Sequence, residues 1–200
     1  LIDSSASMRR GDLWNVAIAS AKEMIGNVQS DGSVAVMTIG QTPRTLVSFG
    51  DWRDADPSRR ADIAMKAIDE ISPEWSGSDL GNGMIAAAEM IADAVGDEDS
   101  SLPAEIVVIS DLQSGATLDA VAEATWPGEL SVLLTQVEAS STNNAAISAA
   151  ASSDPDKPTV RVRNDPDSET SSFEIRAGSQ TISAIVPPGE SRFFQLAAPA

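Results

Sequence analysis

The sequence predicts a three-layer α/β/α domain with a mainly parallel central sheet, followed by a small all-β domain. Through about residue 138, short apolar runs alternate with helical patterns, which is typical of a sheet covered by helices. Beyond that point the chain becomes rich in Ser, Thr, Asn and Asp, and short runs of period two alternate with turn residues. We therefore expect one domain over residues 1–138 and a second over residues 139–200.

The first domain contains each element that this fold class needs. An amphipathic helix follows Asp12, the expected N-cap, and ends at Gly26. The run EIVVIS at residues 105–110 is almost wholly apolar, which is typical of a central strand buried on both faces. The other expected elements are strands over 33–40 and 44–50 that form a hairpin, a helix over 57–71 with Pro57 near N1, a helix over 80–96 ended by Gly96, a short helix over 118–124 and a strand over 130–137.

The chain opens within an expected strand, LID, which runs directly into a polar loop. The front half of this strand is missing, so we interpret the chain as an excised piece of a longer protein. The runs after residue 138, such as TVRVRN and SFEIRAG, fit a small β-sandwich of immunoglobulin type. This second domain is short for the seven strands of such a fold, which suggests that it is either small or truncated.

Composition excludes several classes of function. The chain has 30 acidic and 13 basic residues and a net charge of −17, so it repels nucleic acid and anionic lipid. It has no Cys and no His, which removes thiolate nucleophiles, zinc–thiolate sites and the Ser-His-Asp triad. No apolar run approaches the roughly 20 residues of a membrane span.

Hydroxyls and carboxylates gather where strands of the predicted sheet end. Asp3, Ser5 and Ser7 follow the first strand, and Asp111 follows the run EIVVIS. Ser78, in GSDLGNG, precedes a helix that would begin beside them. Ligands bind at the carboxyl ends of parallel strands, and oxygen donors without nitrogen or sulfur suit Mg²⁺ or Ca²⁺. Water or a partner must supply the remaining ligands.

These stretches resemble the von Willebrand factor type A domain family. Asp3-Ser4-Ser5-Ala6-Ser7 matches the DxSxS loop of the family, and Asp111 in ISDLQSG matches its third-loop aspartate. Ser78 stands at the second-loop position that is usually Thr, so it keeps the hydroxyl but loses the methyl that helps to fix the rotamer. In this family the three loops together form the metal-ion-dependent adhesion site.

The resemblance implies a role for each residue. Ser5, Ser7 and Ser78 would contact Mg²⁺, or alternatively Mn²⁺ or Ca²⁺, while Asp3 and Asp111 would act directly or through water. A Glu or Asp of a partner protein would complete the octahedron. Neutral hydroxyls leave positive charge on the ion, which attracts that carboxylate. Trp75 and Asp79 would lie on the partner-binding rim.

The stretches ISDLQSG and VPPGESRFFQL further resemble bacterial membrane-anchored proteins of the Bat type, which are related to aerotolerance. That resemblance implies a periplasmic or extracellular location, with the membrane anchor outside this chain. The expected function is a non-enzymatic protein-binding module.

Three alternatives stay open from the sequence alone. The Ser and Asp residues could simply cap turns and helices, as Ser78 could cap the helix near Leu80. A metal-dependent phosphoryl-transfer enzyme of the haloacid dehalogenase type also places an Asp after its first strand, but its second Asp would stand where this chain has Ser5. The third alternative is a structural domain whose metal site has decayed.

Overall fold

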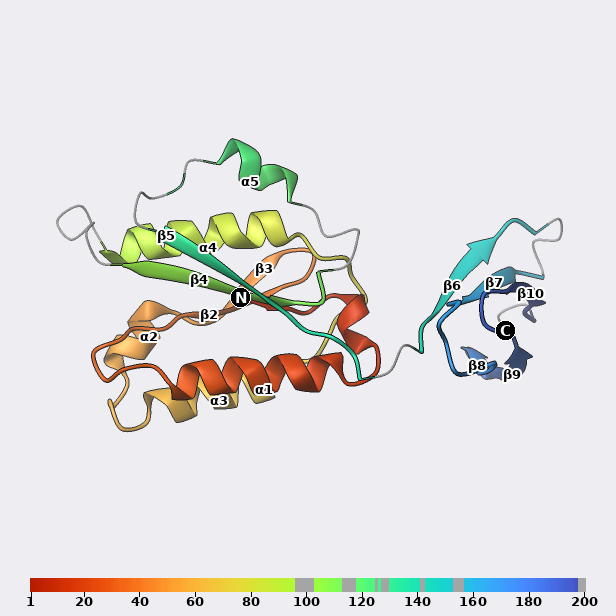
Figure 1. Cartoon of the computed structure of the whole chain (residues 1–200), viewed down its shortest axis with the longest axis horizontal. Coiled ribbons are helices and arrows are strands. Elements are labelled where there is room, and N and C mark those ends of the chain that lie inside the picture. The colour runs from red at the N-terminus through yellow and green to blue at the C-terminus, as the bar shows by residue number, and fades with distance from the viewer. Residues whose placement is uncertain are drawn as a thin grey trace. The chain divides into compact units, whose positions relative to one another are not determined.

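The protein forms two compact units, Leu1–Ala139 and Ser140–Ala200, in the computed structural model (Figure 1). We describe each unit by itself. The structure describes residues 1–95, 103–112, 118–124, 126, 130–140, 143–152 and 157–197.

The first unit contains a five-stranded sheet in the order β3-β2-β1-β4-β5. The central strand β1 is parallel to both neighbours, β4 is parallel to β5, and only the edge strand β3 is antiparallel to its neighbour. The predicted mainly parallel sheet is therefore confirmed. The strands are β1 (Ile2–Asp3), β2 (Val36–Ile39), β3 (Pro43–Val47), β4 (Ala104–Ser110) and β5 (Leu130–Gln136).

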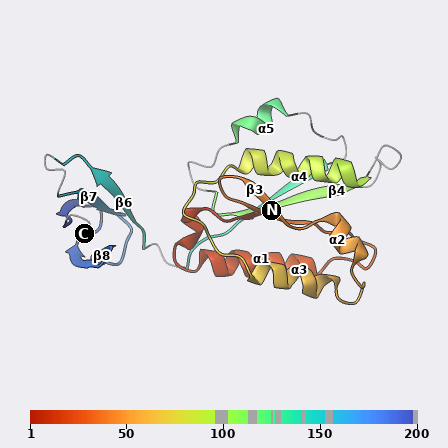
Figure 2. The same cartoon turned by 180° about the vertical axis from the view of Figure 1, so that it is seen from behind.

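Helices cover both faces of this sheet, which confirms the three layers (Figures 1 and 2). Helices α1 and α3 lie on one face, and α4 and α5 lie on the other. Each face has its own buried apolar cluster, with Leu13 and Ile68 in the first and Leu80 and Val108 in the second. The helices are η1 (Ala6–Arg9, a 3-10 helix), α1 (Leu13–Gly26), α2 (Phe49–Asp54), α3 (Arg60–Asp69), α4 (Leu80–Val95) and α5 (Asp119–Glu123).

Side-chain spacing explains how α1 and α4 pack. Helix α1 buries Leu13, Ala17, Ala21 and Ile25, which recur every four residues and so share one face. Helix α4 approaches β2 closely at Gly83, where a Cβ would lie 2.6 Å from Cδ1 of Ile39. Only glycine fits at this crossing.

The strand predicted over 44–50 is wrong beyond Val47. Ser48 ends the strand and caps α2, and its hydroxyl accepts a hydrogen bond from the Asp51 amide at 3.1 Å. The Asp51 carboxylate accepts a bond from the Ser48 amide at 2.9 Å, which completes a capping box. The Ser48 hydroxyl also donates to the Asp51 carboxylate at 2.6 Å, and this bond, together with the bond from the Ser48 amide, lowers the pKa of Asp51. The S-x-x-D spacing was the signal for this helix in the sequence.

Two other predicted boundaries move, and one predicted cap lacks its side-chain bond. Helix α3 begins at Arg60, so Pro57 lies before the helix and not near N1. Strand β2 covers only residues 36–39 of the predicted 33–40. Asp12 is at the N-cap position of α1 without a side-chain capping bond. The predicted end of α4 at Gly96 lies outside the described residues.

The second unit consists of antiparallel strands in two small sheets, of order β10-β7-β6 and β8-β9. Val162, Ile175, Ala184 and Val186 form its buried core. All five predicted apolar runs form strands here, but a complete immunoglobulin domain has about seven. The strands are β6 (Ala145–Ala150), β7 (Thr159–Asn164), β8 (Ser172–Ala177), β9 (Gln180–Ile185) and β10 (Ser191–Gln195).

Candidate metal-binding site

The predicted site residues lie at the carboxyl edge of the central sheet. Asp3 is the last residue of β1, and Asp111 directly follows β4, the neighbouring parallel strand. Both residues are buried, with exposed fractions of 1% and 6%. Two carboxylates therefore lie near each other with little access to solvent.

The carboxylate of Asp3 is held at both oxygens. Its Oδ1 accepts a hydrogen bond from the Ser5 amide at 2.9 Å, and its Oδ2 accepts one from the Ser110 hydroxyl at 2.6 Å. These two bonds fix the orientation of the carboxylate, because each donor comes from the end of a different strand.

A chain of hydrogen bonds connects the first loop to Asp111. The Oγ atoms of Ser5 and Ser7 are 3.1 Å apart. The Ser7 hydroxyl donates to Oδ1 of Asp111 at 3.0 Å, across more than a hundred residues of sequence. Together with the Asp3–Ser5 bond, these contacts bring four of the five predicted ligands into one hydrogen-bonded group.

The second loop is attached to the first by backbone hydrogen bonds. The Glu74 amide donates to the Ser4 carbonyl at 2.7 Å, and the Ala6 amide donates to the Ser76 carbonyl at 2.9 Å. Ser78, the fifth predicted ligand, follows two residues later. Its Oγ atom is buried and has no hydrogen-bond partner among the described residues. A buried hydroxyl without a partner is costly, so a further hydrogen-bond or metal partner would stabilise this atom.

Asp79, and not Ser78, caps the helix that follows. The carboxylate of Asp79 accepts hydrogen bonds from the Asn82 amide at 3.1 Å and from the Asn82 side chain at 2.7 Å. This satisfies one of the first amides of α4, which begins at Leu80. The hydroxyl of Ser78 is therefore not used for capping.

Trp75 lies in the same second loop and is 82% exposed. The guanidinium carbon of Arg9 lies 4.2 Å from the centre of the indole ring, which is a cation–π contact. Arg9 also donates from Nη1 to the Pro73 carbonyl at 2.6 Å. The exposed ring is thus held in place beside the first loop.

Sequence reasoning missed three residues of the site. Ser110 orients Asp3, as described above, and its hydroxyl also accepts a bond from the Leu112 amide at 3.0 Å. Leu112 has a φ of 47°, a strained value for a non-glycine residue that is typical of functional sites. Nη2 of Arg10 lies 4.0 Å from Oδ2 of Asp111. For these three residues, the only feature of the sequence that pointed to the site was the position of Ser110 directly before Asp111.

The donor atoms of this group favour a hard divalent cation. Among the residues that the structure describes, no three or more His, Cys, Asp or Glu side chains are grouped so that they could hold a metal ion by themselves. The site instead offers two carboxylates and several hydroxyls, a donor set suited to Mg²⁺, Mn²⁺ or Ca²⁺ when water completes the shell. The unpartnered hydroxyl of Ser78 fits such a group.

Comparison with protein families identifies the domain that contains this group of residues. The sequence profile of the von Willebrand factor type A domain matches residues 1–115, which include all five predicted ligands. The chain belongs to this family. No curated protein matches the chain significantly. Von Willebrand factor type A domains typically mediate protein–protein interactions, are usually not catalytic and often bind divalent cations.

Among the described residues, none of the helices combines the length and the apolar character that crossing a membrane requires.

Proposed function

We propose that this von Willebrand factor type A domain has a working metal-ion-dependent adhesion site that binds an acidic side chain of a partner protein. Ser5, Ser7 and Ser78 contact the ion through their hydroxyl oxygens. Asp3 and Asp111 neutralise its charge directly or through water. The ion supplies a positive centre to which a Glu or Asp carboxylate of the partner binds.

The buried Oγ of Ser78 is the observation on which this proposal rests. The other hydroxyls of the predicted set bond to one another or to Asp111, whereas Ser78 has no partner among the described residues. A folded protein tolerates a buried hydroxyl without a protein partner when a bound ligand supplies the missing interaction. The backbone bonds between the two loops keep Ser78 beside the rest of the set.

Charge explains the preference for an acidic partner. Hydroxyl ligands are neutral, and carboxylates that act through water compensate the ion only from a distance, so positive charge remains at its open coordination position and attracts a further anion. The net charge of −17 would otherwise repel an acidic partner, which makes the interaction dependent on the ion. Trp75 supplies an exposed aromatic anchor beside this contact, as hot-spot residues do in interfaces.

We propose a binding role rather than phosphoryl transfer. In the haloacid dehalogenase type of enzyme, the first-strand Asp attacks the phosphorus atom as a nucleophile. Here both carboxylate oxygens of Asp3 accept hydrogen bonds, and the residue is only 1% exposed. A carboxylate held in this way is a poor nucleophile.

The proposed setting is the periplasmic or extracellular face of a bacterial membrane. The Bat-type resemblance of ISDLQSG and VPPGESRFFQL supports it. Fractionation of cells that express the protein tests this placement, and recovery of all the protein from the cytoplasm would contradict it.

Thermal unfolding of the metal-stripped protein with and without millimolar Mg²⁺, Mn²⁺ or Ca²⁺ tests the site. All four tryptophans lie before Ala139, so tryptophan fluorescence reports the unfolding of the first unit alone. A ligand that binds only the folded state at 100 times its Kd stabilises it by about 2.7 kcal/mol. We therefore expect Tm to rise by roughly 5–10 °C.

Two variants distinguish binding from charge screening. Asp3→Ala removes a proposed ligand, and Asp62→Ala removes the same charge from an exposed position on α3. We expect the ion response to vanish in the first variant and to persist in the second. An equal response in both variants would mean that the ions only screen the acidic surface.

A further inference from the structure

The two edge strands of the sheet in the first unit differ in their resistance to further pairing. Strand β3 has five residues, begins at Pro43 and carries the exposed charge of Arg44. Its pairing with β2 also has a shift of register between Val36 and Met37. Proline, charge and irregular register are features that keep an edge strand from pairing with other chains. Strand β5, with the sequence LSVLLTQ, has seven residues and contains no charged residue, Pro or Gly.

Strand β5 is open to a further strand along its outer side. In the sheet that the structure describes, β4 is its neighbour on one side and no strand lies on the other. The pairing with β4 is regular over all seven residues, from Leu130 to Gln136. An edge strand of this kind presents a row of unpaired N–H and C=O groups, which is a template for another strand.

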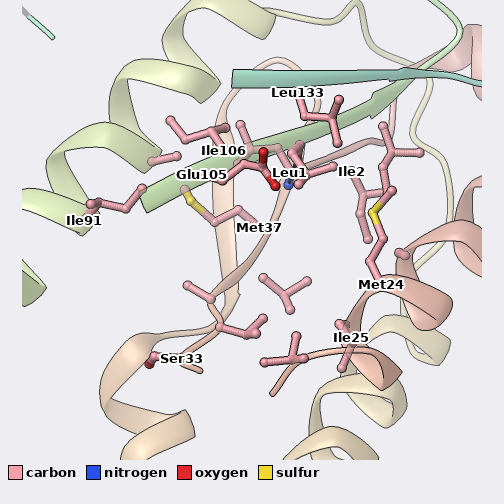
Figure 3. A pocket seen from close by; sticks show the side chains of 18 of the residues that line it. Leu1, Ile2, Met24, Ile25, Ser33, Met37, Ile91, Glu105, Ile106 and Leu133 are labelled. Carbon is pink, nitrogen blue, oxygen red and sulfur yellow. Dashed lines mark hydrogen bonds between the residues drawn. The ribbon is translucent and has the colours of Figure 1, made fainter. Parts of the chain in front are cut away.

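Three consecutive apolar side chains of β5 are exposed. Val132, Leu133 and Leu134 have exposed fractions of 42%, 45% and 51%. Leu133, shown in Figure 3 beside the teal strand β5, pairs with Val107, which packs against the buried cluster of the α1 layer. The residues of β4 opposite Val132 and Leu134 belong to the cluster of the α4 layer. Since paired residues share a face, β5 exposes apolar surface on both faces of the sheet.

The sequence of β5 is complementary to itself when it is read in the opposite direction. If two copies of β5 pair antiparallel about a two-fold axis at Leu133, apolar side chains meet apolar ones and hydroxyls meet hydroxyls, except at the strand ends. No like charges meet within this contact, although each copy has a net charge of −17. The facing pairs are Leu133 with Leu133, Val132 with Leu134, Ser131 with Thr135 and Leu130 with Gln136.

We propose that β5 binds the β5 strand of a second copy of this chain and so joins the two five-stranded sheets into one continuous sheet. The two-fold axis makes the two strands antiparallel and places Leu133 at the centre of the contact. The carboxyl ends of β1 and β4, where the candidate metal site lies, then point in opposite directions in the two copies. The dimer therefore presents two separate sites to partner proteins.

The length of β5 determines how stable this dimer is. At about 3.3 Å per residue, seven paired residues give a contact roughly 23 Å long. Obligate dimers bury more than about 2,000 Å², and a single pair of strand edges is small by that standard. We therefore expect a dimer that forms at high protein concentration and separates on dilution.

Sedimentation velocity of the full chain tests the proposal. Leu133→Lys places two like charges against each other at the axis, and Ile63→Lys makes the same change at a 43% exposed position on α3. At about 200 μM we expect the unaltered chain and Ile63→Lys to sediment with twice the chain mass of 20.8 kDa, whereas Leu133→Lys stays monomeric because its Kd rises at least about tenfold.

Two results of this experiment would overturn the proposal. One is an unaltered chain that stays monomeric at this concentration. The other is a dimer of normal affinity in Leu133→Lys, which would show that the copies meet through another surface, such as the edge strand β6 of the second unit.

Cysteine cross-linking tests the register independently, and the chain has no cysteine of its own. Leu133→Cys would face the same position of the second copy, so we expect a disulfide between chains. Ser131→Cys alone should not cross-link, because its two copies would be offset by four residues, or about 13 Å, along the strands. Mixing Ser131→Cys with Thr135→Cys should restore the disulfide. No cross-link in Leu133→Cys, or equal cross-linking in Ser131→Cys alone, would contradict the proposed pairing.

Discussion

At the scale of single residues, hydrogen bonds determine which oxygen atoms remain available to a ligand. Both oxygens of Asp3 accept bonds from protein donors, which favours a role through water. Ser7 and Asp111 are bonded to each other and must adjust when an ion enters. Ser78 is the one predicted ligand whose oxygen has no partner in the described part of the chain.

Asp111→Ala should abolish the stabilisation by divalent ions. The substitution removes one of two carboxylates and the acceptor of the Ser7 hydroxyl. Tryptophan-detected unfolding with and without 5 mM Mg²⁺ measures the effect, and the expected change in Tm is close to zero. An ion response of normal size in this variant would show that Asp111 is not a ligand.

Substitutions at Ser78 should change stability and ion binding in opposite directions. Ser78→Ala removes a buried hydroxyl that has no partner, so we expect the metal-free protein to gain about 1 kcal/mol. The same change removes an ion ligand and should weaken Mg²⁺ binding by about tenfold or more. Calorimetric titration and urea unfolding measure the two effects.

Ser78→Thr is the matched comparison. It retains the oxygen and restricts the rotamer, so Mg²⁺ binding should be equal or tighter. Binding that weakened as much in Ser78→Thr as in Ser78→Ala would argue against a role for this oxygen.

Arg10→Gln should strengthen ion binding. The Arg10 guanidinium lies 4.0 Å from Asp111, where its positive charge opposes a cation. The arginine side chain is 27% exposed, and such pairs are worth about 0.2–1 kcal/mol, so we expect the Kd for Mg²⁺ to fall by up to about fivefold. Arg59→Gln, an exposed arginine before α3, makes the same change of charge and should leave the Kd unchanged.

At the scale of elements, the position of α4 depends on its contact with β2. The second loop, which contains Ser78, ends where α4 begins, and the Asp79 amide donates to the Gly40 carbonyl just after β2. A shift of α4 relative to β2 therefore displaces Ser78 from the first loop. Gly83, where α4 crosses β2, sets the distance between these two elements.

Gly83→Ala should destabilise the first unit and weaken ion binding together. The new Cβ would lie 2.6 Å from Cδ1 of Ile39, which is fully buried and cannot move freely. Overpacking of this kind costs about 1–3 kcal/mol. Gly50→Ala, within α2, meets its nearest neighbour at 3.5 Å and should be neutral or slightly stabilising. Urea unfolding compares the two variants, and equal effects would exclude steric crowding as the cause.

At the scale of the whole molecule, a polypeptide that begins at Leu1 has a free ammonium group there, and this group makes its stability depend on pH. Burial lowers the pKa of the Leu1 ammonium from its usual value near 8 to about 5. The chain has no histidine, so few other groups titrate between these values. In that range the unfolded chain binds a proton that the folded chain does not bind.

The free energy of unfolding should therefore rise as the pH increases from 5 to 8. The full effect of three pKa units is at most about 4 kcal/mol, and it is lost as the pH falls toward 5. Urea unfolding detected by tryptophan fluorescence measures the slope. Acetylation of the Leu1 nitrogen removes the titrating group and should flatten the profile, whereas an unchanged slope would assign it to other groups.

The sequence by itself determined the order of most elements and the edge of the sheet at which the candidate site residues gather. Apolar periodicity distinguished the buried strand at residues 105–110 from the amphipathic helices, because burial on both faces of a sheet leaves little room for polar side chains. Strand ends followed by Asp3 and Asp111 were visible as local patterns. Parallel strands bring such ends to one edge, so the grouping of these residues was predictable.

Only the tertiary structure determined the bonds within the site and the exact ends of several elements. The capping box of Ser48 ended a strand that β propensity alone would have continued. The roles of Ser110 and Arg10 depend on contacts between residues about a hundred positions apart. The unpartnered Oγ of Ser78 likewise arises from packing, because burial and hydrogen bonding are properties of the folded chain and not of local sequence.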